Sequence, residues 1–272
     1  MDSALPIGVF DSGIGGLTVL KALLERLPGE SFLYLGDTAR LPYGTKTAAT
    51  VERYALQAVQ ELVRRGVKAV VIACNTASSA ALPALTAAHP ELPVVGVIEP
   101  GAAAAVAATT SGRIAVLATE GTVRGGAYQR EILKRLPAAQ VVAVPATLFV
   151  ALAEEGWVQG EVAEAAARRY LAPLFGAGAQ QPDTLVLGCT HFPPLADAIR
   201  GVVGPAVQVV DSAFTSAGVL ARLLEARGVR SSAAAAGNVG FLVTDGEERF
   251  ARVGPVFLGR PIDQAAVVRV DL

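Results

Sequence analysis

The chain has 272 residues, of which 52% are hydrophobic and 17% are charged, and its formal net charge is −1. This length allows one large domain or two smaller ones with a substantial core. The near-neutral charge provides no basic surface for nucleic acid or for an anionic membrane. No apolar run is long enough to cross a bilayer, and the first ten residues lack the basic region of a signal peptide. Because two cysteines do not make a disulfide framework, we expect a cytoplasmic protein that binds neither nucleic acid nor membrane.

Short runs of β-branched apolar residues alternate with amphipathic stretches along most of the chain. The strands predicted by this pattern are residues 7–10, 32–36, 68–73, 93–98, 113–118, 140–144, 184–188, 207–210 and 239–243. Between them lie segments such as residues 47–66, in which apolar residues recur at helical spacing and a glycine ends the pattern. Continuous apolar strands separated by helices are typical of parallel sheets covered on both faces. The sequence therefore predicts an α/β fold with mainly parallel strands.

Two local patterns occur twice in the sequence. Residues 70–82 and 184–195 each contain an apolar run, a cysteine and then a helix-like segment, and residues 7–16 resemble residues 114–126. These similarities predict two similar open-sheet α/β domains that face each other. If the last strands return to the first unit, the first domain is 1–97 together with 208–272, and the second is 98–207.

Polar residues follow the predicted strands where ligands bind in open parallel sheets, beyond the carboxyl ends. They are Asp11-Ser12, Asp37-Thr38, Cys74-Asn75-Thr76, Thr119, Cys189-Thr190-His191 and Asp211-Ser212. Asp, Ser, Thr and Asn are also common helix N-caps, which is the structural alternative for most of these positions. That alternative does not explain a cysteine at two equivalent places. The nearby segment DSGIGGLTV lacks the third glycine of a dinucleotide-binding loop and fits a turn whose backbone N–H groups approach a small carboxylate.

The two cysteines are the strongest functional candidates, although each taken alone could be a small buried core residue. We expect both to precede a helix start, where the helix dipole lowers the pKa of a thiol below its usual value of about 8.5. A disulfide switch does not match the CxxC pattern, zinc would need more soft ligands than His191 supplies, and a Cys-His hydrolase would leave one thiol without a role. Proton transfer on both faces of a planar intermediate would use both thiols.

Seven motifs follow one another in an order that resembles the glutamate racemases. They are GVFDSGIGGLTVL, GDTARLPYGTKT, ACNTAS, VIEPG, GTVRGGAYQR, LGCTHFP and VDSA. The resemblance extends from about residue 7 to 215. It implies an amino-acid racemase that needs no cofactor and no metal, with its active site in the cleft between two α/β domains. It also implies a role in supplying D-glutamate for peptidoglycan, and so in cell-wall biogenesis and cell shape.

The resemblance also implies roles for individual residues. Cys74 and Cys189 would be the two acid/base thiols, with Asp11 orienting or tuning Cys74, His191 doing the same for Cys189, and Glu154 as a further helper. The residues implied to bind glutamate are Asp11, Ser12, Pro42, Tyr43, Gly44, Asn75, Thr76, Thr119, Thr122, Thr190 and His191.

The chain departs from the family pattern at two places. Members often have Cys-Pro where this chain has Val144-Pro145, and Ser where it has Gly125. Two alternatives remain open: an aspartate or hydantoin racemase of the same superfamily, and a binding or regulatory protein on this scaffold with idle thiols. We expect a homodimer.

Overall fold

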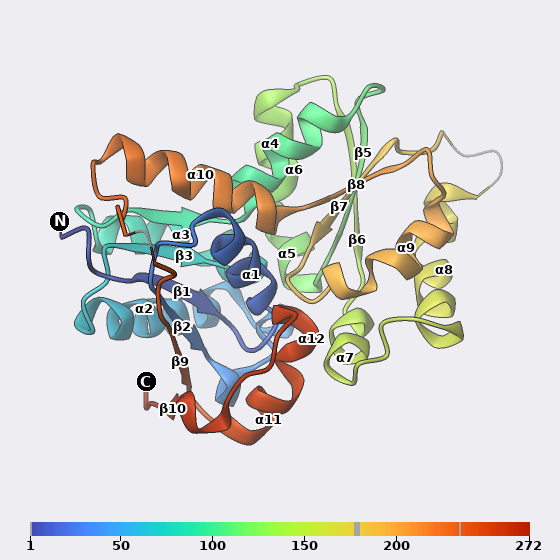
Figure 1. Cartoon of the computed structure of the whole chain (residues 1–272). Coiled ribbons are helices and arrows are strands. Elements are labelled where there is room, and N and C mark those ends of the chain that lie inside the picture. The colour runs from blue at the N-terminus through green and yellow to red at the C-terminus, as the bar shows by residue number, and fades with distance from the viewer. Residues whose placement is uncertain (1, 177–179, 234) are drawn as a thin grey trace.

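The computed structural model describes residues 2–176, 180–233 and 235–272, and within them it contains two parallel β-sheets (Figure 1). The first sheet has the order β10-β9-β2-β1-β3-β4 and the second has the order β6-β5-β7-β8. Neighbouring strands run parallel throughout both sheets. The strands of the first sheet are β1 (Ile7–Asp11), β2 (Phe32–Gly36), β3 (Ala69–Ile72), β4 (Val94–Gly96), β9 (Val239–Val243) and β10 (Val267–Arg269). Those of the second are β5 (Arg113–Ala118), β6 (Gln140–Pro145), β7 (Thr184–Gly188) and β8 (Gln208–Asp211). The predicted α/β class and all nine predicted strands are confirmed.

The four strands β2-β1-β3-β4 and the four strands β6-β5-β7-β8 follow the same order in their sheets. β3 therefore corresponds to β7. Cys74 lies two residues beyond the end of β3, and Cys189 directly follows β7. The repeated sequence pattern around the two cysteines thus reflects equivalent positions in two sheets of the same topology.

Helices cover both faces of each sheet, as parallel strands buried on both sides require. The helices packed on the first sheet are α1 (Leu17–Arg26), α2 (Ala48–Arg64), α3 (Asn75–Ala88) and α10 (Ser212–Ala226). Those packed on the second are α4 (Ile98–Ala108), α6 (Ala127–Arg135), α7 (Leu148–Glu154), α8 (Glu161–Phe175) and α9 (Ala196–Val203). The short helices α5 (Glu120–Gly125), α11 (Glu247–Val253) and α12 (Pro255–Leu258) lie near the carboxyl ends of the strands.

The apolar side chains of each strand alternate between two cores. In β1, Val9 packs into the core below α1 and α10, whereas Phe10 packs into the core below α2 and α3. In α2, Val51, Ala55 and Leu62 are buried on one helical face, which explains why this segment covers the sheet. The first of these cores continues through Leu185 and Leu187 of the second sheet, so apolar contacts connect the two halves.

The chain crosses from one sheet to the other after β4 and returns after β8. α4 already packs against β7 and β8 of the second sheet, whereas α10 packs along α1 of the first. Residues 208–211, which we expected in the first domain, pair instead with β7, so the boundary expected after residue 207 is wrong for this strand. Hydrophobic periodicity identifies a strand, but it does not determine with which other strand that strand pairs.

Strand β10 was not predicted from the sequence. It has only three residues and pairs with β9 at the edge of the first sheet. A run this short lacks the periodic signal on which the sequence argument depends.

Candidate active site

A narrow cavity at the carboxyl ends of both sheets contains both cysteines. Its lining residues are Ser12, Gly13, Leu41, Pro42, Tyr43, Gly44, Cys74, Asn75, Thr76, Thr119, Val150, Glu154, Cys189, Thr190 and His191. The free volume is about 30 Å³, whereas small-molecule sites commonly measure roughly 300–1,000 Å³. The structure is therefore closed around the site, and the cavity must widen to admit a ligand.

Most of the residues that the sequence pointed to meet in this cavity. Asp11 and Thr122 do not line it: both are buried directly behind lining residues. Three lining residues were not predicted, namely Gly13, Leu41 and Val150. Gly13 belongs to the DSGIGG turn that the sequence singled out. The apolar side chains of Leu41 and Val150 carry no chemical signal that sequence reasoning could use. Gly125, one of the family departures, lies outside the cavity against Ser79.

Cys74 is the N-cap residue of α3. The backbone N–H of Ala77 donates to the Cys74 Sγ atom over 3.4 Å, and the residue is 5% exposed. Burial, followed by the negative charge of Asp11, raises the pKa of the Cys74 thiol to about 12, although hydrogen bonds from Ser12 and Ala77 oppose this. The predicted helix start is confirmed. The predicted lowering of the pKa at Cys74 is wrong, because desolvation outweighs the helix terminus.

Cys189 does not precede a helix start, contrary to the sequence prediction. A turn and a short 3₁₀ segment (Pro193–Leu195) follow it, and α9 begins only at Ala196. Pro193 and Pro194 lack backbone N–H donors, which prevents a regular helix from running back toward the thiol. The partner of Cys189 is instead His191, whose Nδ1 atom lies 3.9 Å from the Cys189 Sγ atom.

Cys189, His191, Glu154 and Arg249 form a chain of polar contacts. The His191 Nε2 atom lies 3.1 Å from Glu154 Oε1, and the Arg249 guanidinium donates to Glu154 Oε2 over 2.9 Å. Burial disfavours the charged form of His191, but its hydrogen bonds with Cys189 and Glu154 outweigh burial and raise the pKa of His191 to about 10. Burial also opposes ionisation of Glu154, but His191 and Arg249 together lower the pKa of its carboxyl. The His191 imidazole thus lies between the Cys189 thiol and the Glu154 carboxylate.

Asp11 lies at the end of β1 and is fully buried. Its Oδ2 atom accepts a hydrogen bond from the backbone N–H of Gly13 over 2.9 Å. Burial raises the pKa of Asp11, although the charge of His191 and the backbone N–H groups of Gly16, Gly13 and Ser12 oppose the rise. The carboxyl group of Asp11 thus interacts electrostatically with both Cys74 and His191.

Hydroxyl and amide groups gather at the part of the cavity between α3 and α5. The Oγ1 atoms of Thr76, Thr119 and Thr122 lie 2.9–3.2 Å from one another. The Tyr128 hydroxyl donates to Asn75 Oδ1 over 2.8 Å, whereas Asn75 Nδ2 has no hydrogen-bond partner among the described residues. These groups can donate hydrogen bonds to a carboxylate group of a ligand.

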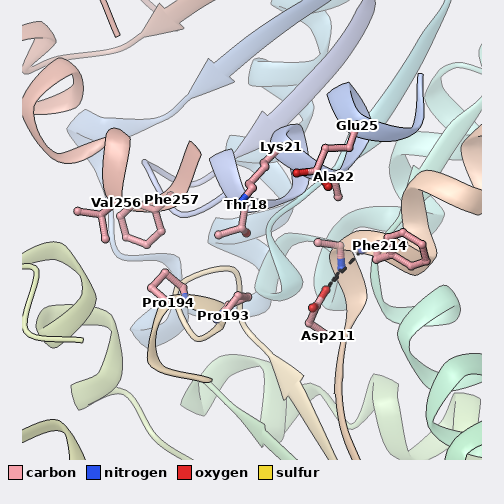
Figure 2. A pocket seen from close by; sticks show the side chains of 11 residues that line it. Thr18, Lys21, Ala22, Glu25, Pro193, Pro194, Asp211, Phe214, Val256 and Phe257 are labelled. Carbon is pink, nitrogen blue, oxygen red and sulfur yellow. Dashed lines mark hydrogen bonds between the residues drawn. The ribbon is translucent and has the colours of Figure 1, made fainter. Parts of the chain in front are cut away.

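A second cavity, of about 340 Å³, lies between α1, α12 and the start of α10 (Figure 2). Asp211 lines it and accepts hydrogen bonds from the backbone N–H groups of Ala213 over 2.9 Å and Phe214 over 3.4 Å. The N-cap alternative thus accounts for Asp211. Since neither cysteine lines this cavity, it lacks the two thiols that make the first one chemically distinctive.

Within residues 2–176, 180–233 and 235–272 there is no group of three or more His, Cys, Asp or Glu side chains that could hold a metal ion. In the same part of the chain no helix combines the length and the apolar character needed to span a membrane.

Comparisons with known proteins agree with this geometry. The family described as Asp/Glu/Hydantoin racemase matches residues 7–219. A glutamate racemase from Geobacter metallireducens is 50% identical over 265 residues, which cover 97% of each chain. The crystal structure of glutamate racemase from Thermus thermophilus, in complex with β-chloro-D-alanine, superposes with a TM-score of 0.89 at 44% identity and covers 100% of this chain and 99% of that one. Glutamate racemase from Francisella tularensis, in complex with D-glutamate, superposes with a TM-score of 0.91 at 35% identity and covers 99% and 98% of the two chains. With both cysteines in one cavity and this similarity over nearly its whole length, the chain belongs to the Asp/Glu/Hydantoin racemase family and, within it, to the glutamate racemases.

Proposed function

We propose that the chain interconverts L-glutamate and D-glutamate by proton transfer at Cα between the substrate and two thiols, Cys74 and Cys189, without a cofactor. The observation that carries this proposal is that equivalent strands of two sheets bring the two cysteines into one closed cavity. The similarity to glutamate racemases, one of them in complex with D-glutamate, supports glutamate as the substrate.

In the L-to-D direction, the Cys189 thiolate takes the proton from Cα, and the electron pair of the broken C–H bond remains on the planar carbanion. The Cys74 thiol then donates its proton to the opposite face, which leaves a Cys74 thiolate and a Cys189 thiol. The resting state fits this direction, because burial and Asp11 raise the pKa of Cys74, which therefore starts as the protonated thiol, while the group that faces Cys189 is the His191 imidazole. The reverse reaction starts from the Cys74 thiolate.

The Cα proton of an amino acid is only weakly acidic. The site must therefore stabilise the negative charge that develops on the α-carboxylate when this proton is removed. We assign this role to hydrogen-bond donors at the strand ends, namely Ser12, Asn75, Thr76 and Thr190. Pro42, Tyr43, Gly44 and Thr119 would complete the substrate site, with Thr122 behind them as the hydrogen-bond partner of Thr76 and Thr119. Asp11 would tune Cys74, and Glu154 would tune Cys189 through His191. The small free volume supports a closed state that excludes water during proton transfer.

Deuterium isotope effects on single-cysteine variants test the two-thiol mechanism. In Cys74→Ser, the weaker oxygen acid makes proton transfer at residue 74 more rate-limiting. The primary isotope effect should then rise for D-[2-²H]glutamate and stay level or fall for the L-enantiomer. Cys189→Ser should show the mirror pattern. Equal changes for both enantiomers in both variants would indicate a single base and contradict the proposal.

The biological setting that we propose is the supply of D-glutamate for peptidoglycan in the cytoplasm, by a homodimer whose protomers each divide into two α/β domains, one around each sheet. Cross-linking and sedimentation of the purified protein test the dimer. A deletion strain that needs external D-glutamate to keep its cell shape would support the cell-wall role.

A further inference from the structure

Helices α11 and α12 follow strand β9 of the first sheet (Figure 1). Their side chains nevertheless contact Glu154 and His191, which belong to the part of the chain that forms the second sheet. On α11, Arg249 donates to Glu154 of α7. On α12, the ring of Phe257 packs edge-on against the ring of His191, with ring centroids 5.2 Å apart and an interplanar angle of 75°. Arg249 and Phe257, which belong to the part of the chain around the first sheet, therefore hold His191 and its partner Glu154, which belong to the part around the second sheet.

Glu154 has a cationic partner on each of its carboxylate oxygens. Oε1 faces His191 and Oε2 faces Arg249. The side chain of Glu154 is only 10% exposed, whereas that of Arg249 is 43% exposed. Without the guanidinium, Oε2 would lose its charged partner in a place that water reaches poorly, so the carboxylate would be free to rotate away or to take up a proton.

The charged groups that face His191 come from several elements. Cys189 precedes it in the same turn, Glu154 reaches it from α7, and Asp11 acts on it from the end of β1. Of these groups, only Glu154 is in direct contact with Arg249. The contacts that connect Arg249 with Cys189 therefore run through Glu154 and His191, and this path can be tested by substitution.

We propose that Arg249 is a positioning residue for proton transfer at Cys189: it holds the Glu154 carboxylate in place, and Glu154 in turn orients His191 toward the thiol. The direction of the Glu154 pKa shift, to which Arg249 contributes, is consistent with this path. The consequence for turnover rests on the proposed function, whereas the effect on the ionisation of Cys189 does not. An ion pair that merely joined two surface helices would leave that ionisation unchanged.

The test uses a Cys74→Ala background, in which Cys189 is the only cysteine of the chain. The fraction of thiolate at Cys189 is followed against pH by ultraviolet absorbance and by the rate of reaction with iodoacetamide. In Arg249→Gln we expect the midpoint to move upward by about 0.5 pH unit, a roughly threefold loss of thiolate on the rising part of the curve, because a partly exposed ion pair is screened by solvent. Arg249→Lys keeps the charge and should restore most of the thiolate.

Arg252 provides the matched control. It lies on the same helix, is exposed, and makes no ion pair with the part of the chain that the structure describes. Arg252→Gln removes the same charge from α11 and should leave the Cys189 midpoint unchanged. An equal shift in Arg249→Gln and Arg252→Gln would indicate a general charge effect and overturn the proposal.

Folding is monitored by thermal unfolding, with Arg249→Met as a second variant. If either Arg249 variant melts at a lower temperature but titrates like its parent, the ion pair is structural only and the proposal is wrong. In the enzyme with both cysteines, Arg249→Gln should lower kcat about threefold and raise the isotope effect more for L-[2-²H]glutamate than for the D-enantiomer. Absence of racemisation in the unsubstituted protein would overturn the proposed function, while the Cys189 titration would still decide the role of Arg249.

Discussion

Gly15, in the turn after β1, lies so close to His191 that a Cβ atom added to Gly15 would be 2.4 Å from His191 Nδ1. The same Cβ atom would be 2.6 Å from Thr190 Oγ1. A Cβ atom does not approach other atoms this closely, so the turn after β1 can lie against His191 and Thr190 only because residue 15 has no side chain. The second glycine of the DSGIGG turn therefore allows the first-sheet half to approach the imidazole that faces Cys189.

The first prediction follows from this contact. Gly15→Ala should displace His191 or Thr190 and lower kcat by roughly 100-fold, since a misplacement of about 1 Å at a reacting group can have this effect. Steady-state racemisation followed by circular dichroism measures the change. Gly201→Ala in α9 is the matched control, because a Cβ atom there meets nothing within 4 Å and should leave kcat unchanged. Normal kcat in Gly15→Ala would mean that the two halves can separate here at no catalytic cost.

A second prediction concerns the order in which the thiols react. Both are buried, but burial and Asp11 raise the pKa of Cys74 to about 12, whereas a protonated His191 faces Cys189. Limiting iodoacetamide at neutral pH should therefore modify Cys189 before Cys74, because the thiolate is the reactive form. Peptide mass spectrometry of partly modified protein gives the order. Faster modification of Cys74 would show that access, and not ionisation, controls the reaction.

The third prediction is a dependence of stability on pH. The folded-state pKa of His191 is raised from about 6.5 to about 10, so its stabilising contribution is fully present below about 6.5 and is lost as the pH rises toward 10. His191→Asn removes this contribution. The melting temperatures of the two proteins should differ most near pH 6 and converge as the pH approaches 10. A difference that stayed constant over this range would indicate that His191 stabilises the fold by packing alone.

The fourth prediction concerns the removal of charge at His191 and at Asp11. At neutral pH, Asp11→Asn and His191→Asn should each lower kcat strongly while most of the protein remains folded. The reason is that Asp11 interacts with Cys74 and His191 with Cys189, the two groups that transfer protons. Parallel assays of kcat and of thermal unfolding separate the two effects. If a variant kept near-normal kcat, the tuning role given to that residue would be wrong, while the roles of the cysteines would stand.

The last prediction is a preference for glutamate over aspartate. Aspartate is shorter by one methylene group, so in the closed cavity its side-chain carboxylate cannot satisfy the same donors, and unpaired buried donors are costly. The ratio of kcat/KM for the two amino acids, measured side by side, should favour glutamate strongly. Comparable values would support the aspartate racemase alternative.

The sequence by itself determined the class of fold, nearly every strand and, together with the family resemblance, most of the residues that line the cavity. It could do so because buried parallel strands are continuous apolar runs, and because the polar residues of such sheets gather where those runs end. The two cysteines could be identified because each follows the same strand of a repeated pattern, which is a property of local sequence.

Only the tertiary structure decided how the two thiols differ. The sequence placed both at helix starts, yet Cys74 has a raised pKa and Cys189 is paired with His191, because desolvation and charge depend on neighbours that are distant in the chain. The pairing of β8 with β7 and the contact of Arg249 with Glu154, 95 residues away in sequence, were inaccessible for the same reason. Local patterns report what a segment prefers to form, whereas the packing of distant segments sets which side chains meet and how they ionise.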